Sequence, residues 1–250
     1  MRRKLVAAIA CRNSGSRLYG KPLQNLDIEN GVRIIDNIID NLNSINCIDS
    51  IVLGVSEGTE NEIFKLIAGE KKINFIVGDQ IDVLHRLILC AEKAKATDVF
   101  RITSESPFLY FKPVKNLWEK HLSNNNDATF YDNIVDGCGF EFIKLSALKK
   151  SHKLGQERHR SELCTLFIRE NLDNFKVQKV KAPNYLNRKD LRLTVDNPED
   201  LVLCRSVYNE FKNDAPNIDL EDIIRYLDKN PHLKKLTYPF TIEGYDTMYL

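Results

Sequence analysis

Basic residues, glycines and serines gather in one short segment near the amino terminus. They fall within ten residues directly after an apolar run, and they are Arg12, Ser14, Gly15, Ser16, Arg17, Gly20 and Lys21. The backbone N–H groups of a glycine-rich loop, together with fixed positive charge, commonly hold a chain of phosphates. The segment therefore predicts a phosphate-binding loop, although the glycines by themselves are equally typical of a solvated turn.

The spacing of this segment also matches the beginning of a Walker A loop, with Gly15, Gly20 and Lys21 at the required positions. Position 22 is proline, where that motif needs serine or threonine to hold Mg²⁺. Proline also disfavours a helical conformation at Lys21 and has no N–H to offer a phosphate. The sequence therefore argues against a P-loop kinase or GTPase.

Short apolar runs alternate with amphipathic segments along the chain. The runs that predict strands are Leu5–Cys11, Ser50–Val55, Asn74–Val77, Val99–Thr103, Ala128–Tyr131, Phe140–Ile143, Phe175–Val180 and Leu191–Val195. Apolar residues at helical spacing predict helices within Ile34–Ile45, Val83–Ala91 and Leu201–Phe211. This alternation is typical of βαβ units, so we expect an α/β protein with a Rossmann-like, three-layer α/β/α arrangement and a mostly parallel sheet.

Ligands of such sheets bind at the carboxyl ends of the strands, which is where the basic segment lies. We expect residues 1–213 to form this domain, because no linker rich in proline, glycine and serine divides the chain. Residues 214–250 are expected to hold a helix from Asp219 to about Asp228 and then an irregular, aromatic-rich tail. This part is expected to pack on the same domain or on a partner subunit.

Composition excludes several classes of protein. The 250 residues are 43% hydrophobic and 28% charged, so the chain is not a disordered one. A net charge of +1 argues against a broad basic surface for nucleic acid or for an anionic membrane. The apolar run Leu5–Cys11 is too short for a signal peptide or a membrane span. The six cysteines form no metal or C-x-x-C pattern, which favours reduced thiols and a cytoplasmic location.

From Arg12 to Leu23 the basic segment follows the pattern R-x-x-x-S-R-L-x-G-K-P-L. It resembles the signature of the cytidylyltransferases that make CMP-activated sugar acids, above all the branch containing the spore-coat polysaccharide protein SpsF. In that family the loop wraps the phosphates of CTP, and Tyr19 here replaces a usual proline. The resemblance implies a nucleotidyltransferase fold, catalytic roles for the three basic residues and nucleotide contacts from the others. The implied catalytic residues are Arg12, Arg17 and Lys21, and the implied nucleotide-binding residues are Ser14, Gly15, Ser16 and Gly20.

A second segment continues the resemblance. Residues 78–86 are similar to the family's G-x-x-x-D-V-L-x-R pattern, which helps to form the nucleotide pocket. This implies nucleotide-binding roles for Gly78, Asp82 and Arg86. Asp82 at the start of a predicted helix is equally typical of a capping residue.

Two carboxylates are implied as ligands of Mg²⁺. Glu105 stands where the family has the aspartate that binds the magnesium bridging the CTP phosphates, and it is one methylene longer. The segment Leu191–Asp200 matches the family pattern L-R-L-T-V-D-x-P-E-D and implies Asp196 as the second ligand. From the residues alone, Glu105 is also typical of an exposed loop and Asp196 of a turn at the end of a strand.

Two segments resemble the acceptor side of the family. Asp136 and Glu141 belong to a match to D-G-x-D-V-E, in which Gly139 replaces the middle aspartate, and both are implied to bind the acceptor. Further along, Arg158, His159 and Arg160 form a basic cluster that suits a carboxylate or phosphate. The same cluster is typical of a solvated helix start.

The leading hypothesis is an enzyme that transfers CMP from CTP to an anionic acceptor, such as a nonulosonic or 3-deoxy sugar acid, for surface polysaccharide or glycan synthesis. A second hypothesis is a cytidylyltransferase for a phosphorylated or phosphonate acceptor, with a CDP-type product. A third is a catalytically weak nucleotide-sugar binding protein, in which Glu105 and Gly139 mark lost activity. The resemblance also implies a homodimer.

Overall fold

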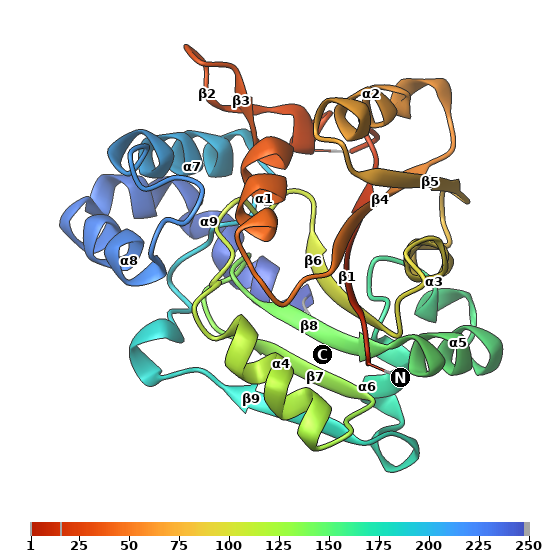
Figure 1. Cartoon of the computed structure of the whole chain (residues 1–250). Coiled ribbons are helices and arrows are strands. Elements are labelled where there is room, and N and C mark those ends of the chain that lie inside the picture. Colours follow the sequence, from red (N-terminus) through yellow and green to blue (C-terminus); the bar gives the residue numbers. More distant parts are fainter. Residues whose placement is uncertain (1, 16, 248–250) are drawn as a thin grey trace.

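The computed structural model describes residues 2–15 and 17–247, with side chains described as far as residue 242. Within these residues, one seven-stranded sheet has the order β5-β4-β1-β6-β8-β7-β9 (Figure 1). Its strands are β1 (Leu5–Cys11), β4 (Ser50–Ser56), β5 (Asn74–Gly78), β6 (Asp98–Thr103), β7 (Ala128–Asn133), β8 (Phe140–Lys144) and β9 (Val177–Lys181). All neighbouring strands are parallel except β8, which runs antiparallel to both β6 and β7. The prediction of a mostly parallel sheet is therefore confirmed.

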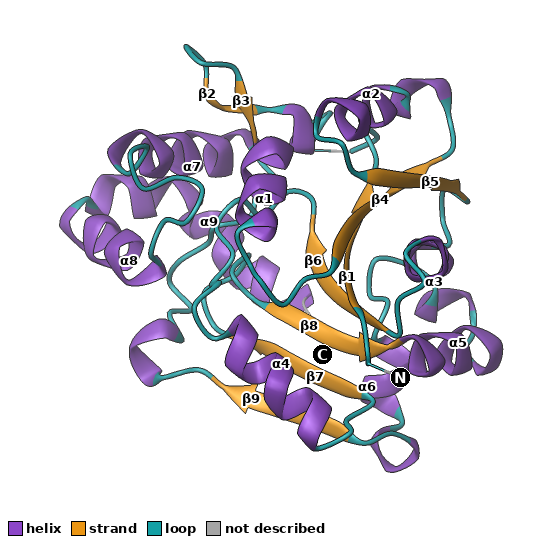
Figure 2. Ribbon diagram, in the orientation of Figure 1, coloured by secondary structure: helices purple, strands orange, loops and turns teal. Residues whose placement is uncertain are grey.

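Helices cover both faces of the sheet (Figure 2). They are α1 (Ile34–Asn43), α2 (Ile63–Glu70), α3 (Val83–Lys93), α4 (Val114–Ser123), α5 (Leu145–Leu154), α6 (Leu166–Glu170), α7 (Pro198–Glu210), α8 (Leu220–Lys229) and α9 (Pro231–Thr247). Successive residues of β1 enter opposite cores, because side chains alternate along a strand. Leu5 and Ala7 pack with α1, α2, α4, α7 and α8, whereas Val6 and Ala8 pack with α3, α5 and α6. This is the predicted three-layer α/β/α arrangement.

The segment Leu191–Val195 corrects one prediction, because it is extended but is not a strand of the sheet. Its backbone makes single bonds to two loops: Leu193 N–H donates to Asp136 O at 2.8 Å and Val195 N–H donates to Glu105 O at 3.0 Å. Leu191, Leu193 and Val195 are almost fully buried, which explains the strand-like pattern. The segment thus runs between two loops at the carboxyl ends of the strands rather than along a neighbouring strand.

The carboxyl-terminal part begins with turns and then forms two helices, α8 and α9, within the described residues. Asp219 caps α8 by accepting a hydrogen bond from Glu221 N–H, and the apolar side of α8 enters the same core as α7. The chain after α8 was expected to be irregular, but it forms α9, which contacts α7 and α8. A short hairpin of β2 (Asn25–Asp27) and β3 (Val32–Arg33) was not predicted either. None of the described helices combines the length and the apolar character needed to span a membrane.

The aromatic cluster on β6 and β8 yields a test of the core. Phe100 is fully buried, and its ring centroid lies 5.2 Å from that of Phe140 and 5.3 Å from that of Phe142. Phe100→Ala should lower the free energy of unfolding by about 3–5 kcal/mol in urea titrations, through lost apolar contact and a residual cavity. Ile28→Ala, at a position that is 66% exposed, is the control. Equal midpoints for the two variants would contradict this assignment of the core.

Candidate active site

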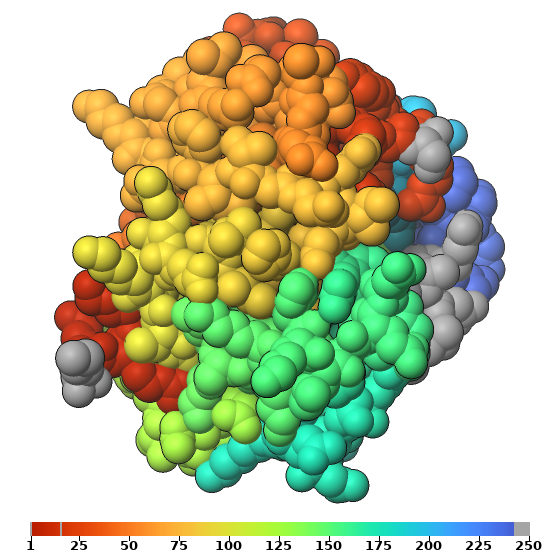
Figure 3. All heavy atoms as spheres, turned by 90° about the vertical axis from the view of Figure 1, so that its right-hand side faces the viewer, coloured from red at the N-terminus to blue at the C-terminus, as the bar shows by residue number. Residues whose placement is uncertain are grey.

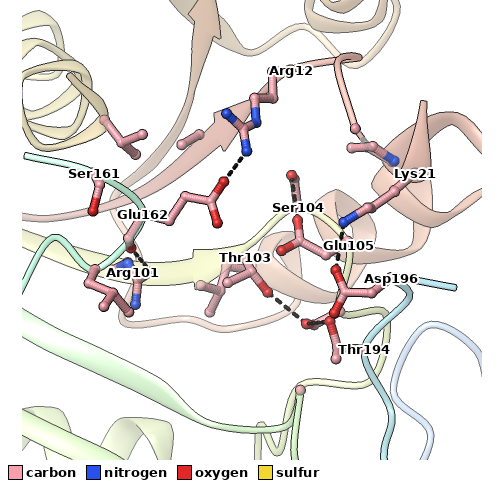
Figure 4. Close-up of a pocket in the computed structure, with 18 of the residues that line it drawn as sticks. Arg12, Lys21, Arg101, Thr103, Ser104, Glu105, Ser161, Glu162, Thr194 and Asp196 are labelled. Carbon is pink, nitrogen blue, oxygen red and sulfur yellow. Dashed lines mark hydrogen bonds and ion pairs between the residues drawn. The ribbon is translucent and has the colours of Figure 1, made fainter. Parts of the chain in front are cut away.

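A cavity of about 920 Å³ opens at the carboxyl ends of β1 and β6. Its walls come from the loop after β1, the start of α3, the loops after β6 and β7, and residues 161–163 and 192–196 (Figure 4). The segment Leu191–Val195 helps to build this wall because its bonds hold it between the loops at Asp136 and Glu105. Thr194 adds to this link by accepting a hydrogen bond from the Ser106 hydroxyl at 3.1 Å. The cavity therefore lies where the topology of a parallel sheet predicts a ligand.

The basic loop after β1 forms one end of the cavity. Arg12, Ser14, Gly15, Arg17 and Lys21 all line it, whereas Ser16 lies outside the described residues. A side chain at position 15 would place its Cβ 2.5 Å from the Leu18 carbonyl oxygen, so the loop is closed too tightly for any residue but glycine.

Gly20 shapes the loop rather than lining it. It is left-handed with φ of 59°, and its N–H donates to Asn13 O at 2.9 Å. Positive φ is a conformation that glycine adopts without strain.

The basic side chains of the loop pair with carboxylates across the cavity, and Figure 4 shows this for Arg12 and Lys21. Lys21 Nζ lies 2.5 Å from Asp196 Oδ1, and an Arg17 guanidinium nitrogen lies 3.3 Å from the same atom. Arg12 forms an ion pair with Glu162, which sequence reasoning did not single out. These pairs are partly exposed, so an incoming phosphate chain can replace the carboxylates.

Glu105 and Asp196 come together as the sequence predicted from the family pattern. Val195 N–H donates to the Glu105 carbonyl, and the Ser104 hydroxyl donates to Glu105 Oε2 at 3.0 Å. Burial raises the pKa of Glu105, and the nearby negative charge of Asp196 raises it further. Burial would also raise the pKa of Asp196, but Lys21, Arg192 and Arg17 hold it below its usual value.

This carboxylate pair matches the donor set of a nucleotide-bound magnesium ion. Among the described residues no group of three or more His, Cys, Asp or Glu side chains is arranged to hold a metal. Magnesium in nucleotide sites is commonly held by one or two carboxylates together with phosphate oxygens. The repulsion that raises the pKa of Glu105 is what a divalent cation would relieve. The two residues therefore fit the ion only together with a phosphate ligand.

Arg192 is a second residue of the cavity that sequence reasoning overlooked. Its side chain is 3% exposed and pairs with three carboxylates at once: Asp136 at 2.7 Å, Asp200 at 3.1 Å, and Asp196. The Asp200 carboxylate also accepts from the backbone N–H groups of Asp196 and Asn197, at 3.0 and 2.9 Å. Arg192 is the arginine of the family pattern L-R-L-T-V-D-x-P-E-D and lies four residues before Asp196. That pattern could therefore have identified it.

Only part of the second predicted nucleotide-binding segment, residues 78–86, lines the cavity. Arg86 lines the cavity, but Gly78 and Asp82 are not among its lining residues. Gly78 packs against the stem of Arg86, where a Cβ would lie 2.9 Å from Arg86 Cγ. Asp82 caps α3 by accepting from His85 N–H, and it pairs with His152 at 2.7 Å. Asp82 therefore lies where the alternative interpretation of the sequence put it, as the residue that caps a helix.

Arg86 is a buried cation beside the cavity. Its side chain is 1% exposed, and one guanidinium nitrogen donates to the carbonyls of Cys11 and Gly54. Its Nε has no hydrogen-bond partner among the described residues, and burial lowers its pKa. A buried cation bonded only to carbonyls is suited to receive an anion or a carbonyl oxygen of a ligand.

The predicted acceptor residues separate into two groups. Asp136 and Glu141 line the cavity, but the Glu141 carboxylate already binds Arg169 at 2.6 Å and Arg101 at 3.1 Å. Burial would raise the pKa of Glu141, yet these two guanidinium groups hold it below its usual value. Glu141 is therefore held inside the wall as one member of a charge network.

The basic cluster of residues 158–160 does not reach the cavity. Arg158 forms a bidentate pair with Glu170, and His159 Nε2 lies 2.8 Å from the same carboxylate. Arg160 donates to His152 O at 3.2 Å. The chain continues into the cavity wall at the next residues, which are Ser161, Glu162 and Leu163. The side chains of the cluster therefore bind to α6 and α5 and do not line the cavity.

Comparison with known proteins identifies the family. A family model described as cytidylyltransferase matches residues 6–234, which is most of the chain. The chain belongs to the cytidylyltransferase family. It is also 30% identical to an uncharacterized protein of Methanocaldococcus jannaschii, over 93% of this chain and 94% of that protein. It is 23% identical to the spore coat polysaccharide biosynthesis protein SpsF of Bacillus subtilis, over 89% of this chain and 93% of SpsF.

Solved structures share the fold of this cytidylyltransferase. A cytidylyltransferase from Leptospira borgpetersenii superposes with a TM-score of 0.83 at 20% identity, covering 93% of this chain and 97% of that one. A CMP:2-keto-3-deoxy-manno-octonic acid synthetase complexed with CTP gives a TM-score of 0.60 at 14% identity, over 83% of this chain and 99% of that one. These likenesses establish the nucleotidyltransferase fold.

The protonation of Asp136 tests the charge network that Arg192 forms with Asp136, Asp196 and Asp200 in this cytidylyltransferase. Burial raises the pKa of Asp136 to about 6, Arg192 opposes the rise, and the charges of Asp196 and Asp200 add to it. A carboxyl with a raised native pKa binds a proton in the folded chain that the unfolded chain has already lost. Stability from this group is therefore present below pH 4 and is lost as the pH rises through about 6.

We therefore expect the wild-type free energy of unfolding to fall, relative to that of Asp136→Asn, as the pH rises from about 4 to about 7. The difference should reach up to about 3 kcal/mol, since one pKa unit corresponds to about 1.4 kcal/mol. Urea unfolding of both proteins at several pH values measures it. Parallel pH curves for the two proteins would show that Asp136 is ionised throughout.

Proposed function

We propose that this cytidylyltransferase transfers CMP from CTP to an oxygen atom of a small anionic acceptor and releases pyrophosphate. The observation that carries the proposal is the convergence of Lys21 and Arg17 on Asp196 at one end of the cavity. Three basic side chains in a tight glycine loop suit a triphosphate. The choice of CTP rests on the family, and on the structural relative whose title names a complex with CTP.

The reaction needs mainly positioning and charge from the protein. The acceptor oxygen attacks the α-phosphorus of CTP, and the bond from that phosphorus to the oxygen bridging the β-phosphorus breaks. Negative charge then develops on the departing pyrophosphate, next to the loop after β1. Arg12, Arg17 and Lys21 stabilise that charge after the triphosphate has replaced Glu162 and Asp196 as their partner. Arg86 supplies a further fixed positive charge at the base of the cavity.

Magnesium is the metal that we propose for this site. Glu105 and Asp196 would hold it together with the CTP phosphates, and it would neutralise charge on the phosphate oxygens. Lys21 and Arg17 now pair with Asp196, and both would be free to bind the phosphates if Asp196 held the ion instead. Arg192 keeps Asp196 in position during this exchange, because its other bonds to Asp136 and Asp200 are unaffected.

For the acceptor we propose a sugar acid, such as a nonulosonic or 3-deoxy sugar, used in surface polysaccharide or glycan synthesis. The printed names of SpsF and of the octonic acid synthetase support this class. The alternative of a phosphorylated or phosphonate acceptor depended on Arg158 and Arg160, which lie outside the cavity. The alternative of a weakly active binding protein depended on Glu105 and Gly139. Both line the cavity, and the Glu105 carboxyl lies close enough to Asp196 to be affected by its charge.

The acceptor assignment is tested by pyrophosphate release from CTP with Mg²⁺ and a panel of sugar acids, sugar phosphates and phosphonates. We expect release with sugar acids, little without an acceptor, and less with UTP or ATP in place of CTP. Release only with phosphorylated acceptors would replace the sugar-acid proposal. CTP binding without release from any acceptor would favour the binding protein.

Lys21 is the residue whose removal should be most informative. Lys21→Ala should lower turnover of CTP by about 10²-fold or more, because a charge aimed at the leaving group is lost. Its thermal unfolding should stay close to that of the wild type, since its ion pair is partly exposed. Lys115→Ala, an exposed change away from the cavity, serves as the matched control. Near-wild-type kinetics for Lys21→Ala would refute the assigned role.

A further inference from the structure

A short loop between β4 and α2 reaches the basic loop after β1. It contains one 3-10 turn, Thr59–Asn61, and Asn61 is 1% exposed. β4 and α2 lie at the upper right of Figure 1. Figure 3 turns that side of the molecule toward the viewer and shows orange residues of this region beside red residues of the amino-terminal part. Asn61 is not among the residues that line the cavity, so it adjoins the candidate active site from outside.

Two buried asparagines join these two loops. Asn61 Oδ1 accepts a hydrogen bond from Asn13 N–H at 2.8 Å, and Asn61 Nδ2 donates to Glu57 O at 3.1 Å. In the other direction, the side-chain amide of Asn13 donates to Glu60 O. Asn13 is 4% exposed and lines the cavity. The loop after β4 is thus bonded directly to a residue of the candidate active site.

The Asn13 N–H needs an acceptor at this point of the chain. β1 pairs with β4 as far as Cys11, which lies opposite Val55, and its pairing with β6 ends one residue earlier. Asn13 follows the last paired residue, so no strand of the described sheet accepts from its N–H. A buried N–H without an acceptor is costly, because it has given up its bond to water. The Asn61 side chain supplies the acceptor that a strand supplies elsewhere in the sheet.

Hydrogen bonds fix the backbone on both sides of Arg12. On one side, Arg86 Nη1 donates to Cys11 O at 3.1 Å. On the other side, Asn61 accepts from Asn13 N–H. The direction of a side chain in a site depends on how firmly the surrounding bonds hold the backbone that carries it. Asn61 and Arg86 together therefore hold the stretch from which Arg12 enters the cavity.

The backbone of Asn13 also closes the basic loop. Gly20 N–H donates to Asn13 O at 2.9 Å, so residues 13 and 20 are held together. Arg17 lies inside this closed stretch and Lys21 follows it, and both side chains pair with Asp196. A bond that holds Asn13 in place therefore also holds the stretch that carries these basic side chains.

We propose that Asn61 is a positioning residue, whose side chain holds the basic loop in the conformation that receives a chain of phosphates. It does not line the cavity and acts through the Asn13 N–H. Without this acceptor the loop would adopt the receptive conformation for only part of the time, and the apparent affinity for phosphates falls with that fraction. The inference rests on the proposed function only in taking a triphosphate as the ligand.

Three variants separate positioning from a merely structural role. Asn61→Ala removes the acceptor, whereas Asn61→Asp keeps an oxygen for the Asn13 N–H and loses the amide donor. Asn41→Ala is the matched control, because Asn41 is also buried, at 3% exposed. Its amide donates to Pro216 O at 3.1 Å and to Asn217 Oδ1 at 2.8 Å, and none of these three residues lines the cavity.

Isothermal titration calorimetry measures the binding of CTP, CMP and inorganic tripolyphosphate, each with Mg²⁺. Asn61→Ala should raise the dissociation constants of CTP and tripolyphosphate by about tenfold, the effect expected when one buried hydrogen bond is lost. The constant for CMP should change much less, because CMP lacks the β- and γ-phosphates. Asn41→Ala should change none of the three constants. Asn61→Asp should bind CTP nearly as the wild type does, although its thermal stability falls because a buried carboxylate then lies beside Glu60.

Hydrogen exchange of the single Asn13 amide provides a readout that needs no ligand. This amide should be protected in the wild type, in Asn61→Asp and in Asn41→Ala, and it should exchange faster in Asn61→Ala because its acceptor is gone. Circular dichroism establishes that the variants are folded. If Asn61→Ala fails to fold, Asn61→Leu removes the same acceptor with a side chain of similar shape.

Equal CTP dissociation constants for the wild type and Asn61→Ala, or equal losses for CTP and CMP, would overturn the proposal. A wild type that binds neither CTP nor tripolyphosphate would refute the phosphate site of the proposed function and this inference with it. Weaker tripolyphosphate binding by Asn61→Ala would support the inference even if the wild type did not bind CTP. The proposed function and the role of Asn61 can therefore fail separately.

Discussion

The ion pairs of Arg192 hold the candidate active site together. One buried guanidinium joins Asp136, which follows β7, to Asp196 and Asp200 at the beginning of α7. Three carboxylates around one cation leave excess negative charge, and the site balances it in two ways. Lys21 and Arg17 reach Asp196 from the phosphate loop, and the pKa of Asp136 rises to about 6. Arg192, Asp136 and Asp200 are almost fully buried, so removing one of them would leave a charge that solvent does not stabilise, and these three residues act as a unit.

The same network would allow a nearly neutral protein to bind the triphosphate that we propose as its substrate. The chain has a net charge of +1, but Arg12, Arg17 and Lys21 lie together at the end of β1. Carboxylates satisfy them in the absence of ligand, so the loop carries concentrated charge without strong repulsion. A ligand with several phosphates offers more acceptor oxygens than these carboxylates and forms charge-assisted bonds with the same side chains. The site is therefore charged locally and balanced overall.

Local pattern predicted most of the fold, and it was wrong where an apolar segment had no strand beside it. The run Leu5–Cys11 became β1 because both of its faces are covered by helices and both of its edges by strands. Leu191–Val195 alternates apolar and polar residues and is also buried, but its backbone N–H groups donate to two loops instead of a strand. An apolar pattern indicates that a segment is buried. A strand of a sheet also requires backbone hydrogen bonds to an adjacent strand. The pattern of a segment cannot supply that neighbour.

The amino-acid sequence by itself determined the family and the three-layer fold, and it predicted that the basic loop after β1, Glu105 and Asp196 belong to one site. These features could be found because each follows from a pattern of residues that are close in the chain. Only the tertiary structure decided which charges face the cavity. It turned Arg158 and His159 toward Glu170, brought Glu162 to Arg12, and gave Arg192 its three partners. Ion pairs join residues that are distant in the chain, so side-chain type shows which pairs are possible and only folding selects among them.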